Sequence, residues 1–188
     1  INFWLPSIIK TSGVSDDFHI GLLAALPYAF GAVFMVWNSR HSDLHSERRW
    51  HIAIPAIIGA VGLTLSAYCS GSTFWMMAWI CLAMSGTLSL IPTYISLPGT
   101  LLSGTAAAAG IALVNSVGNL AGFFGPTVLG WLKDNTGSTN TGLYILAAFL
   151  LLCAPLIFLL PARLVNPRRY AEKPAETDEV SSLKRGSV

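Results

Sequence analysis

The fold of this chain is decided by residues 104–130, GTAAAAGIALVNSVGNLAGFFGPTVLG. The stretch contains no Lys, Arg, Asp, Glu or His, and it is long enough to cross a bilayer, since a spanning helix needs about 20 mostly apolar residues. It is rich in small residues and carries the amides Asn115 and Asn119 near its middle. On a 3.6-residue period these amides share a face with Gly122 and Gly125, which predicts a helix with a small, polar stripe.

This stripe has two interpretations. Small residues let a neighbouring helix approach closely, and Gly118 and Gly122 have the G-x-x-x-G spacing, followed by Gly125 and Pro126. The stripe is then a packing seam whose amides bond to neighbouring helices. A buried amide in hydrocarbon is costly unless it meets a partner, a cavity or a ligand, so the same helix could instead line a polar cavity at the membrane centre.

The composition places the chain in the membrane. Of its 188 residues, 53% are hydrophobic and 11% are charged, against about 25% charged in soluble domains. The formal net charge of +2 is too small to indicate nucleic-acid binding. The three cysteines lie in apolar runs without metal-ligand spacing, so we predict no metal site, disulfide or cofactor. They are Cys69, Cys81 and Cys153.

Charged residues divide the chain into helical spans. Asp, Glu, Lys and Arg are absent from residues 18–39, 50–132 and 135–162, and turn-like residues interrupt the longest of these runs. We expect a transmembrane half-domain over residues 1–162 and a disordered tail over 163–188. The first segment is too short to span, which predicts a piece of a longer protein. The predicted helices are 1–12 (incomplete), 19–38, 51–70, 73–97, 105–132 and 141–161.

Lysine and arginine set the predicted orientation. If the helices alternate sides, one side carries only Lys10 and Lys133. The other carries residues 39–50 and the tail, with the other nine basic residues, so both segments are predicted to be cytoplasmic. Those nine are Arg40, Arg48, Arg49, Arg163, Arg168, Arg169, Lys173, Lys184 and Arg185.

Polar side chains from several predicted helices lie near the middle of the bilayer. Asn115 is ten residues past Thr105, which at 1.5 Å per residue is about half the membrane thickness. Transporters place their substrate sites at this depth. The candidate substrate-binding residues are Asn115, Asn119, Tyr94, Thr93, Tyr28 and Asn2. No nucleophile–base constellation accompanies them, because all four histidines lie at span ends, so we predict no enzyme.

A dense group of charges follows the second span, at residues 37–49, WNSRHSDLHSERR. These residues could be solvated positive charges of a cytoplasmic loop. Alternatively they form an ion-paired latch, in which Asp43 bonds an arginine and faces a helix N-terminus, where a carboxylate is favoured. The candidate gating-loop residues are Arg40, Asp43, Glu47, Arg48 and Arg49.

This loop resembles the short cytoplasmic loop of the major facilitator superfamily, with the pattern G-x-x-x-D-R-x-G-R-R. Asp43, Arg48 and Arg49 match it, whereas the leading glycine is replaced near Ser39 and Leu44 stands at a basic position. Within the superfamily, the variant SRHSDxxxERR resembles the second-half loop of the anion:cation symporter family. So do FWLPSIIK at 3–10, LLAALPYAFGA at 22–32, SGTAAAAGIALVNSVGNLAGFFGP at 103–126 and GWLKDNTGS at 130–138.

The resemblance implies an all-α membrane protein with twelve helices in two halves, of which this chain supplies the end of helix 7 and helices 8 to 12. Members of the family import organic anions such as tartrate, phthalate or 4-hydroxyphenylacetate with protons. Their central helix 11 amide, which maps to Asn115, contributes to the substrate cavity. Ile95 replaces a second aromatic residue after Tyr94, which leaves the substrate open.

The implied partners are a small organic anion, protons, the lipid bilayer and the N-terminal half of the same protein, in the inner membrane of a bacterium. No Asp or Glu lies inside a predicted span, so this half cannot by itself couple protons to transport. A second interpretation stays open, in which the chain is a non-transporting membrane module or the remnant of a transporter gene.

Overall fold

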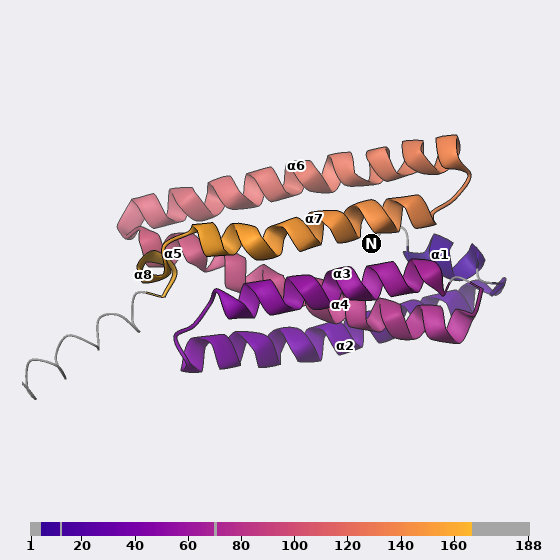
Figure 1. Cartoon of the computed structure of the whole chain (residues 1–188), viewed down its shortest axis with the longest axis horizontal. Helices are drawn as coiled ribbons and strands as arrows, with labels where there is room; N and C mark the ends of the chain where they lie inside the picture. The colour runs from indigo at the N-terminus through magenta and orange to yellow at the C-terminus, as the bar shows by residue number, and fades with distance from the viewer. Residues whose placement is uncertain (1–4, 12, 70, 167–188) are drawn as a thin grey trace, which may run out of the picture.

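The computed structural model describes residues 5–11, 13–69 and 71–166, and these form helices and connections without a strand. Five helical segments are long and apolar enough to cross a membrane, and they coincide with the five complete spans predicted from the sequence. The helices are α1 (Leu5–Thr11), α2 (Asp17–Leu44), α3 (Trp50–Tyr68), α4 (Thr73–Ile95), α5 (Leu97–Leu101), α6 (Gly104–Thr136), α7 (Asn140–Leu159) and α8 (Ala162–Val165) (Figure 1).

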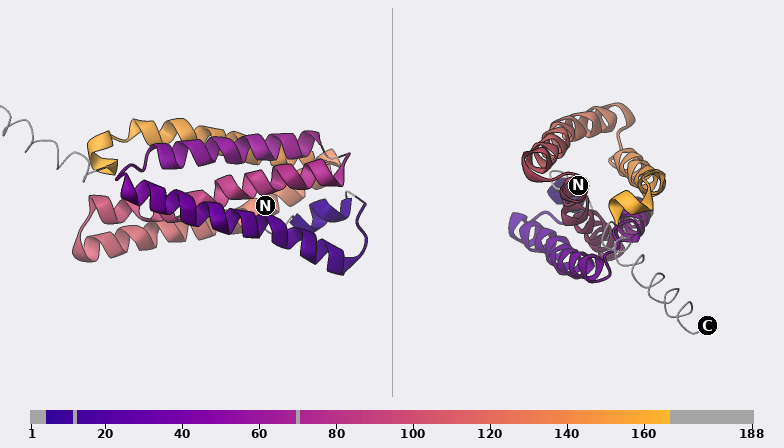
Figure 2. Two further views of the ribbon diagram at one scale, coloured as in Figure 1. Left: turned by 90° about the horizontal axis from the view of Figure 1, so that it is seen from below. Right: turned by 90° about the vertical axis from the view of Figure 1, so that its left-hand side faces the viewer.

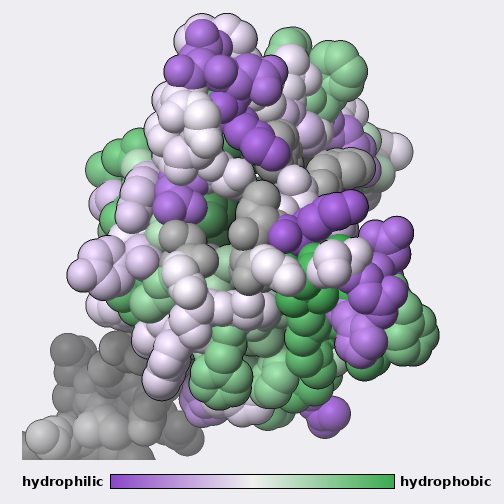
Figure 3. Space-filling model, turned by 90° about the vertical axis from the view of Figure 1, so that its right-hand side faces the viewer, coloured by the Kyte–Doolittle hydropathy of each residue, from purple (hydrophilic) through white to green (hydrophobic). Residues whose placement is uncertain are grey.

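The long helices run antiparallel, so the connections gather at two ends (Figures 1 and 2). One end holds the α2–α3 connection, α5 and α8, and we call it the junction end. The opposite end holds α1 and the α3–α4 and α6–α7 connections. Figure 3 looks onto this opposite end, where hydrophilic side chains are scattered between apolar ones.

The core is built where α3 and α4 approach each other most closely. A Cβ atom added at Gly62 would lie 2.5 Å from the backbone nitrogen of Ala83. A Cβ atom added at Gly86 would lie 2.5 Å from the carbonyl oxygen of Pro55 and from the nitrogen of Gly59. Only glycine fits between backbones this close. Around this contact lies a buried cluster to which α1, α2 and α7 also contribute.

The helix that contains residues 104–130 stands apart from this core. It is helical as predicted, extends to Thr136 and ends where Gly137 adopts the left-handed conformation with φ of +68°. None of its residues is buried. It contacts α5, α7 and, weakly, α4. In the right-hand view of Figure 2, α6 lies away from the α2–α4 layer.

Residues 39–50 are not the loop that the sequence predicted. Helix α2 continues to Leu44, because no Pro or Gly interrupts residues 32–44 and the helical bond from His45 N–H to the carbonyl of His41 closes its last turn. The chain reverses at Ser46, whose φ is +48°. Arg40 and Asp43 therefore lie on α2, and the connection is shortened to residues 45–49.

Two sets of predictions lie outside the described residues. They are the placement of Asn2 and the disorder of the tail beyond residue 166. The first residues of the predicted disordered tail are ordered instead, because residues 163–165 belong to α8 and Asn166 is buried and hydrogen-bonded to the α2–α3 connection. The predicted fourth span also ends earlier than expected, at Ile95, and Pro98 belongs to the short helix α5.

Candidate functional site

An ion pair bridges α2 and the α2–α3 connection at the junction end. Arg48 Nη2 lies 3.6 Å from Asp43 Oδ1, and Arg48 Nη1 donates to the carbonyl oxygen of Ser96 at 3.5 Å. The aspartate side chain is 71% exposed and the arginine 20%. Both line a polar cavity of about 710 Å³, which α5 and the first turns of α6 also border. Asp43 therefore has the arginine partner that was predicted for it.

A buried carboxylate lies beside this pair. Glu47 is 7% exposed, and its oxygens accept hydrogen bonds from Trp50 N–H at 3.1 Å and from Asn166 Nδ2 at 3.3 Å. Its Oε2 also lies 3.1 Å from His51 Nδ1. Since Trp50 begins α3, the negative charge of Glu47 caps the positive end of that helix.

The end of α7 and the segment after it are held against the same connection. Asn166 Oδ1 accepts a hydrogen bond from Arg48 N–H at 2.8 Å, and Asn166 is 5% exposed. Arg49 Nη2 donates to the carbonyl oxygen of Phe158 at 2.5 Å, and its guanidinium lies 5.1 Å from the centre of that ring. Asp43, Arg48 and Glu47 are therefore linked through Asn166, whereas Arg49 contacts the end of α7 and Arg40 is exposed on α2.

A buried amide that the sequence did not reveal joins three helices. Asn38 on α2 is 3% exposed, and its Nδ2 donates to the carbonyl oxygens of His51 at 3.1 Å and Ser89 at 3.3 Å. These acceptors belong to α3 and α4. The sequence places Asn38 at the last residue of a predicted span. The one signal for its burial is that no charged residue stands next to it.

The predicted substrate-binding residues do not meet around one cavity. Asn115 and Asn119 are exposed on α6, and Tyr28 and Tyr94 are each 38% exposed. Thr93 is 4% exposed, and its hydroxyl donates to the carbonyl of Ser89 at 3.3 Å in its own helix. The amides and tyrosines are therefore accessible to groups outside the described chain, whereas the Thr93 hydroxyl already has a hydrogen-bond partner in its own helix.

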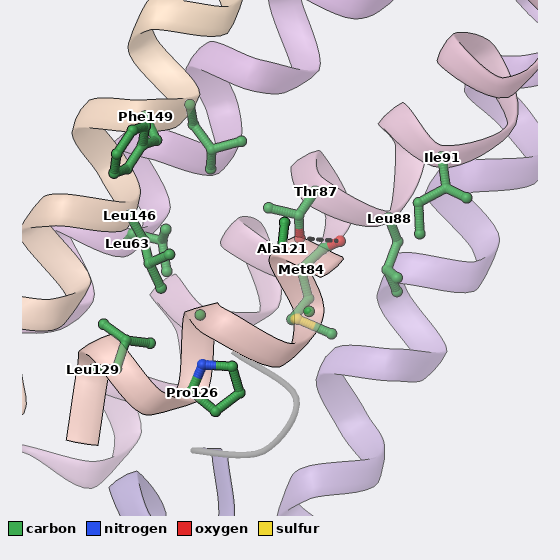
Figure 4. Close-up of a pocket in the computed structure, with 13 residues that line it drawn as sticks. Leu63, Met84, Thr87, Leu88, Ile91, Ala121, Pro126, Leu129, Leu146 and Phe149 are labelled. Carbon is green, nitrogen blue, oxygen red and sulfur yellow. Dashed lines mark hydrogen bonds between the residues drawn. The ribbon is translucent and has the colours of Figure 1, made fainter. Parts of the chain in front are cut away.

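An apolar cavity of about 460 Å³ separates α6 from α3, α4 and α7 (Figure 4). Gly122, Gly125 and Pro126 form part of its α6 wall, and Thr87 bonds the carbonyl oxygen of Ala83 at 2.9 Å. The wall continues by helical spacing toward Asn119 and Asn115. A Cβ atom at Gly118, Gly122 or Gly125 would meet no atom within 4 Å, so the seam predicted there has no partner among the described residues.

Comparison with known proteins identifies the family. Residues 1–187 match the family described as Major Facilitator Superfamily. The chain is 41% identical over 166 residues to a "Putative metabolite transport protein NicT" of Pseudomonas putida, covering 88% of this chain and 38% of that protein. It is 43% identical over 162 residues to a "Putative tartrate transporter" of Agrobacterium vitis, covering 85% and 35%.

A third relative is a "Quinolone resistance transporter" of Acinetobacter baumannii, 37% identical over 164 residues, covering 87% of this chain and 38% of that protein. No solved structure matches the chain. The chain thus spans little more than a third of the length of these curated relatives.

Proposed function

Because the chain belongs to the major facilitator superfamily, we propose that it is the C-terminal half of a twelve-helix secondary transporter that imports a small organic carboxylate with protons. Two relatives carry "tartrate transporter" in their names. The observation that supports a shared cavity most directly is the uncharged, amide-bearing face of α6, which no other described helix covers. In this proposal the N-terminal half faces it.

The proposed orientation puts the junction end and the tail in the cytoplasm of a bacterium and α1 at the outer surface. Of the described basic residues, those at the junction end are Arg40, Arg48, Arg49 and, on α8, Arg163, whereas Lys10 and Lys133 lie at the opposite end. This asymmetry follows the positive-inside rule. Labelling of an introduced cysteine from outside should reach position 138 and should not reach position 46.

In the proposed site, Asn115 contacts the substrate. A carboxamide can donate to a carboxylate and bond a hydroxyl, while a cation in the other half balances the substrate's charge. Losing one hydrogen bond to a charged ligand costs about 1.5–3 kcal/mol, which is about tenfold to a hundredfold in affinity.

The function is tested with the intact transporter in proteoliposomes. Uptake of radiolabelled tartrate and related acids should require an inward proton gradient and should collapse with a protonophore. Asn115→Ala should raise the dissociation constant by about tenfold to a hundredfold with normal folded yield. Its matched control is Ser116→Ala, an exposed neighbour on α6, which should leave affinity unchanged. Unchanged affinity in well-folded Asn115→Ala would remove this residue from the site.

The Asp43–Arg48 pair acts in this proposal as a latch that holds the junction end closed until the helices rock. Asp43→Asn should slow transport far more than it weakens substrate binding, because in this proposal the residue acts on gating and does not contact the substrate. Asp134→Asn, an exposed carboxylate at the opposite end, is the control and should retain the rate. Equal loss of binding affinity in purified Asp43→Asn would contradict the latch.

A further inference from the structure

Three ionisable side chains form a continuous chain across the α2–α3 junction that the latch does not use. Nδ1 of His41, on the last turns of α2, lies 2.7 Å from Nε2 of His51, on the first turn of α3. Nδ1 of His51 lies 3.1 Å from Oε2 of the buried Glu47. The two facing imidazole nitrogens therefore form a direct hydrogen bond between the two helices.

The number of protons on this chain decides whether the contact exists. When His51 donates from Nδ1 to the carboxylate and is neutral, its Nε2 is an acceptor, and His41 donates to it from Nδ1. One additional proton is tolerated wherever it resides, because one facing nitrogen still donates and the other still accepts. When both rings carry an additional proton, N–H groups stand on both facing nitrogens, which cannot remain 2.7 Å apart.

We propose that His41, His51 and Glu47 form a proton-binding site at the junction end, which holds one additional proton and releases α2 from α3 when it takes a second. Histidine is the side chain that gains a proton between pH 8 and 5. His41 is exposed and His51 partly exposed, so solvent protons reach the pair. The site thus binds the ion that the proposed transporter couples to, and this consequence rests on the proposed function.

The groups around His41 oppose a second charge. The ring of His45, also on α2, lies 4.1 Å from it between ring centres, and Trp37 stacks on it at 5.7 Å. From α3 it faces only His51, and Glu47 acts through that ring. Arg40 precedes His41 on α2. The other charged side chains at this end have their own partners, since Asp43 pairs with Arg48 and Arg49 bonds the carbonyl oxygen of Phe158.

Few contacts join α2 directly to α3. Helix α2 packs mainly against α4 and touches α3 only slightly. Among the described residues, the side-chain hydrogen bonds that join α2 directly to α3 are the histidine pair and the bond from Asn38 to the carbonyl of His51. Ser42 and Asp43 on α2 bond instead to the connection, at the Glu47 carbonyl and at Arg48. Separation of the rings therefore loosens the end of α2, which also carries Asp43 of the latch.

The test measures the separation of α2 and α3 directly. Spin labels are placed at Leu44 on α2 and Ile54 on α3, which are 80% and 50% exposed, in intact transporter in nanodiscs. Double electron–electron resonance then compares about pH 7.5 with about pH 5, on either side of the range in which histidine titrates. We expect the distance distribution to shift to longer values at the acid pH.

Three variants assign the shift to this site. His41→Asn keeps an N–H donor near the Nδ1 position but cannot take a proton, so its distribution should stay short at both pH values. His41→Lys adds a permanent charge and should show the long distribution already at about pH 7.5. His19→Gln, at the opposite end of α2, is the matched control and should shift as the parent does.

An identical parent distribution at the two pH values would overturn the proposal, and so would a normal shift in His41→Asn or the loss of the shift in His19→Gln. Both membrane faces meet the same pH in a nanodisc, and no substrate is needed. The proposed function fails if organic acids are not taken up or if the orientation is the opposite one. The distance measurement still tests the proton-binding site in that case.

Discussion

The α3–α4 contact and helix α6 use glycine in opposite ways. In α3 and α4, added Cβ atoms at Gly62 and Gly86 would meet backbone at 2.5 Å. In α6, an added Cβ atom at Gly118 or Gly122 would meet nothing within 4 Å. Apart from Lys133 and Asp134 near the end of α6, both regions lack Lys, Arg, Asp and Glu and are rich in small residues. Of the two, α6 has the G-x-x-x-G spacing, between Gly118 and Gly122.

This difference shows what small residues do and do not specify. They permit close approach, but the approach occurs only where a partner helix with a complementary surface is present. The partner of α3 is the next helix in the chain, joined by a short turn. On α6, the glycine face that contains Gly118, Gly122 and Gly125 borders a cavity instead. We propose that a segment beyond the described residues covers this face in the intact protein.

The largest expected effect breaks the α3–α4 contact. Gly86→Leu should prevent accumulation of folded protein, because overpacking costs about 1–3 kcal/mol even where side chains can shift, and here backbone atoms of Pro55 and Gly59 block the new side chain. Gly21→Leu on α2, where an added Cβ atom meets nothing, is the matched control. Fluorescence-detected size exclusion measures the folded yield. A normal yield for Gly86→Leu would show that α3 and α4 are farther apart than described.

A smaller loss of stability is expected when the buried amide Asn38 is replaced, and the exposed amide Asn119 serves as the comparison. Asn38→Leu should lower the free energy of unfolding by about 1–2 kcal/mol, because it leaves the carbonyls of His51 and Ser89 without this donor. Asn119→Leu, the matched change on exposed α6, should alter folded stability much less. Thermal unfolding followed by tryptophan fluorescence compares them. A larger loss in Asn119→Leu would mean that α6 is bonded to a segment outside the described chain.

The glycine face of α6 is tested by Gly118→Leu and Gly122→Leu in the intact transporter. If a further helix covers this face, both changes should reduce folded yield by blocking its approach, though less than Gly86→Leu does, because the cavity leaves room. The yield in membranes and the uptake rate are measured together. Normal accumulation and normal transport in both variants would place this face against lipid.

The smallest effect is expected outside both regions, at the start of α2. Asp16 accepts a hydrogen bond from the backbone N–H of His19 at 3.4 Å and also pairs with its ring. The His19 side-chain hydrogen bond holds the pKa of Asp16 below its ordinary value of 3.8. The stabilisation is thus complete above that value and is lost as the pH falls through the lowered pKa. Asp16→Asn should change the melting temperature only slightly, and a change as large as that of Asn38→Leu would contradict its surface role.

Local sequence was sufficient for the spans and for part of the site. Hydropathy and charge placed five spanning helices correctly, because crossing a membrane requires a property of each segment alone. The charge cluster after the second span pointed to the network of Asp43, Glu47, Arg48 and Arg49. It did not reveal that α2 continues to Leu44, because charged residues mark the end of the apolar segment but do not end the helix.

Which uncharged residues are buried was decided by the tertiary structure. By sequence, Asn38 ends a span and Asn115 lies at the centre of one, yet Asn38 is buried between three helices and Asn115 is exposed. The partners of Glu47 include Asn166, 119 residues away along the chain. Hydropathy describes each helix on its own, whereas burial and hydrogen bonding require a second surface at the right distance, and that distance exists only once the helices have packed.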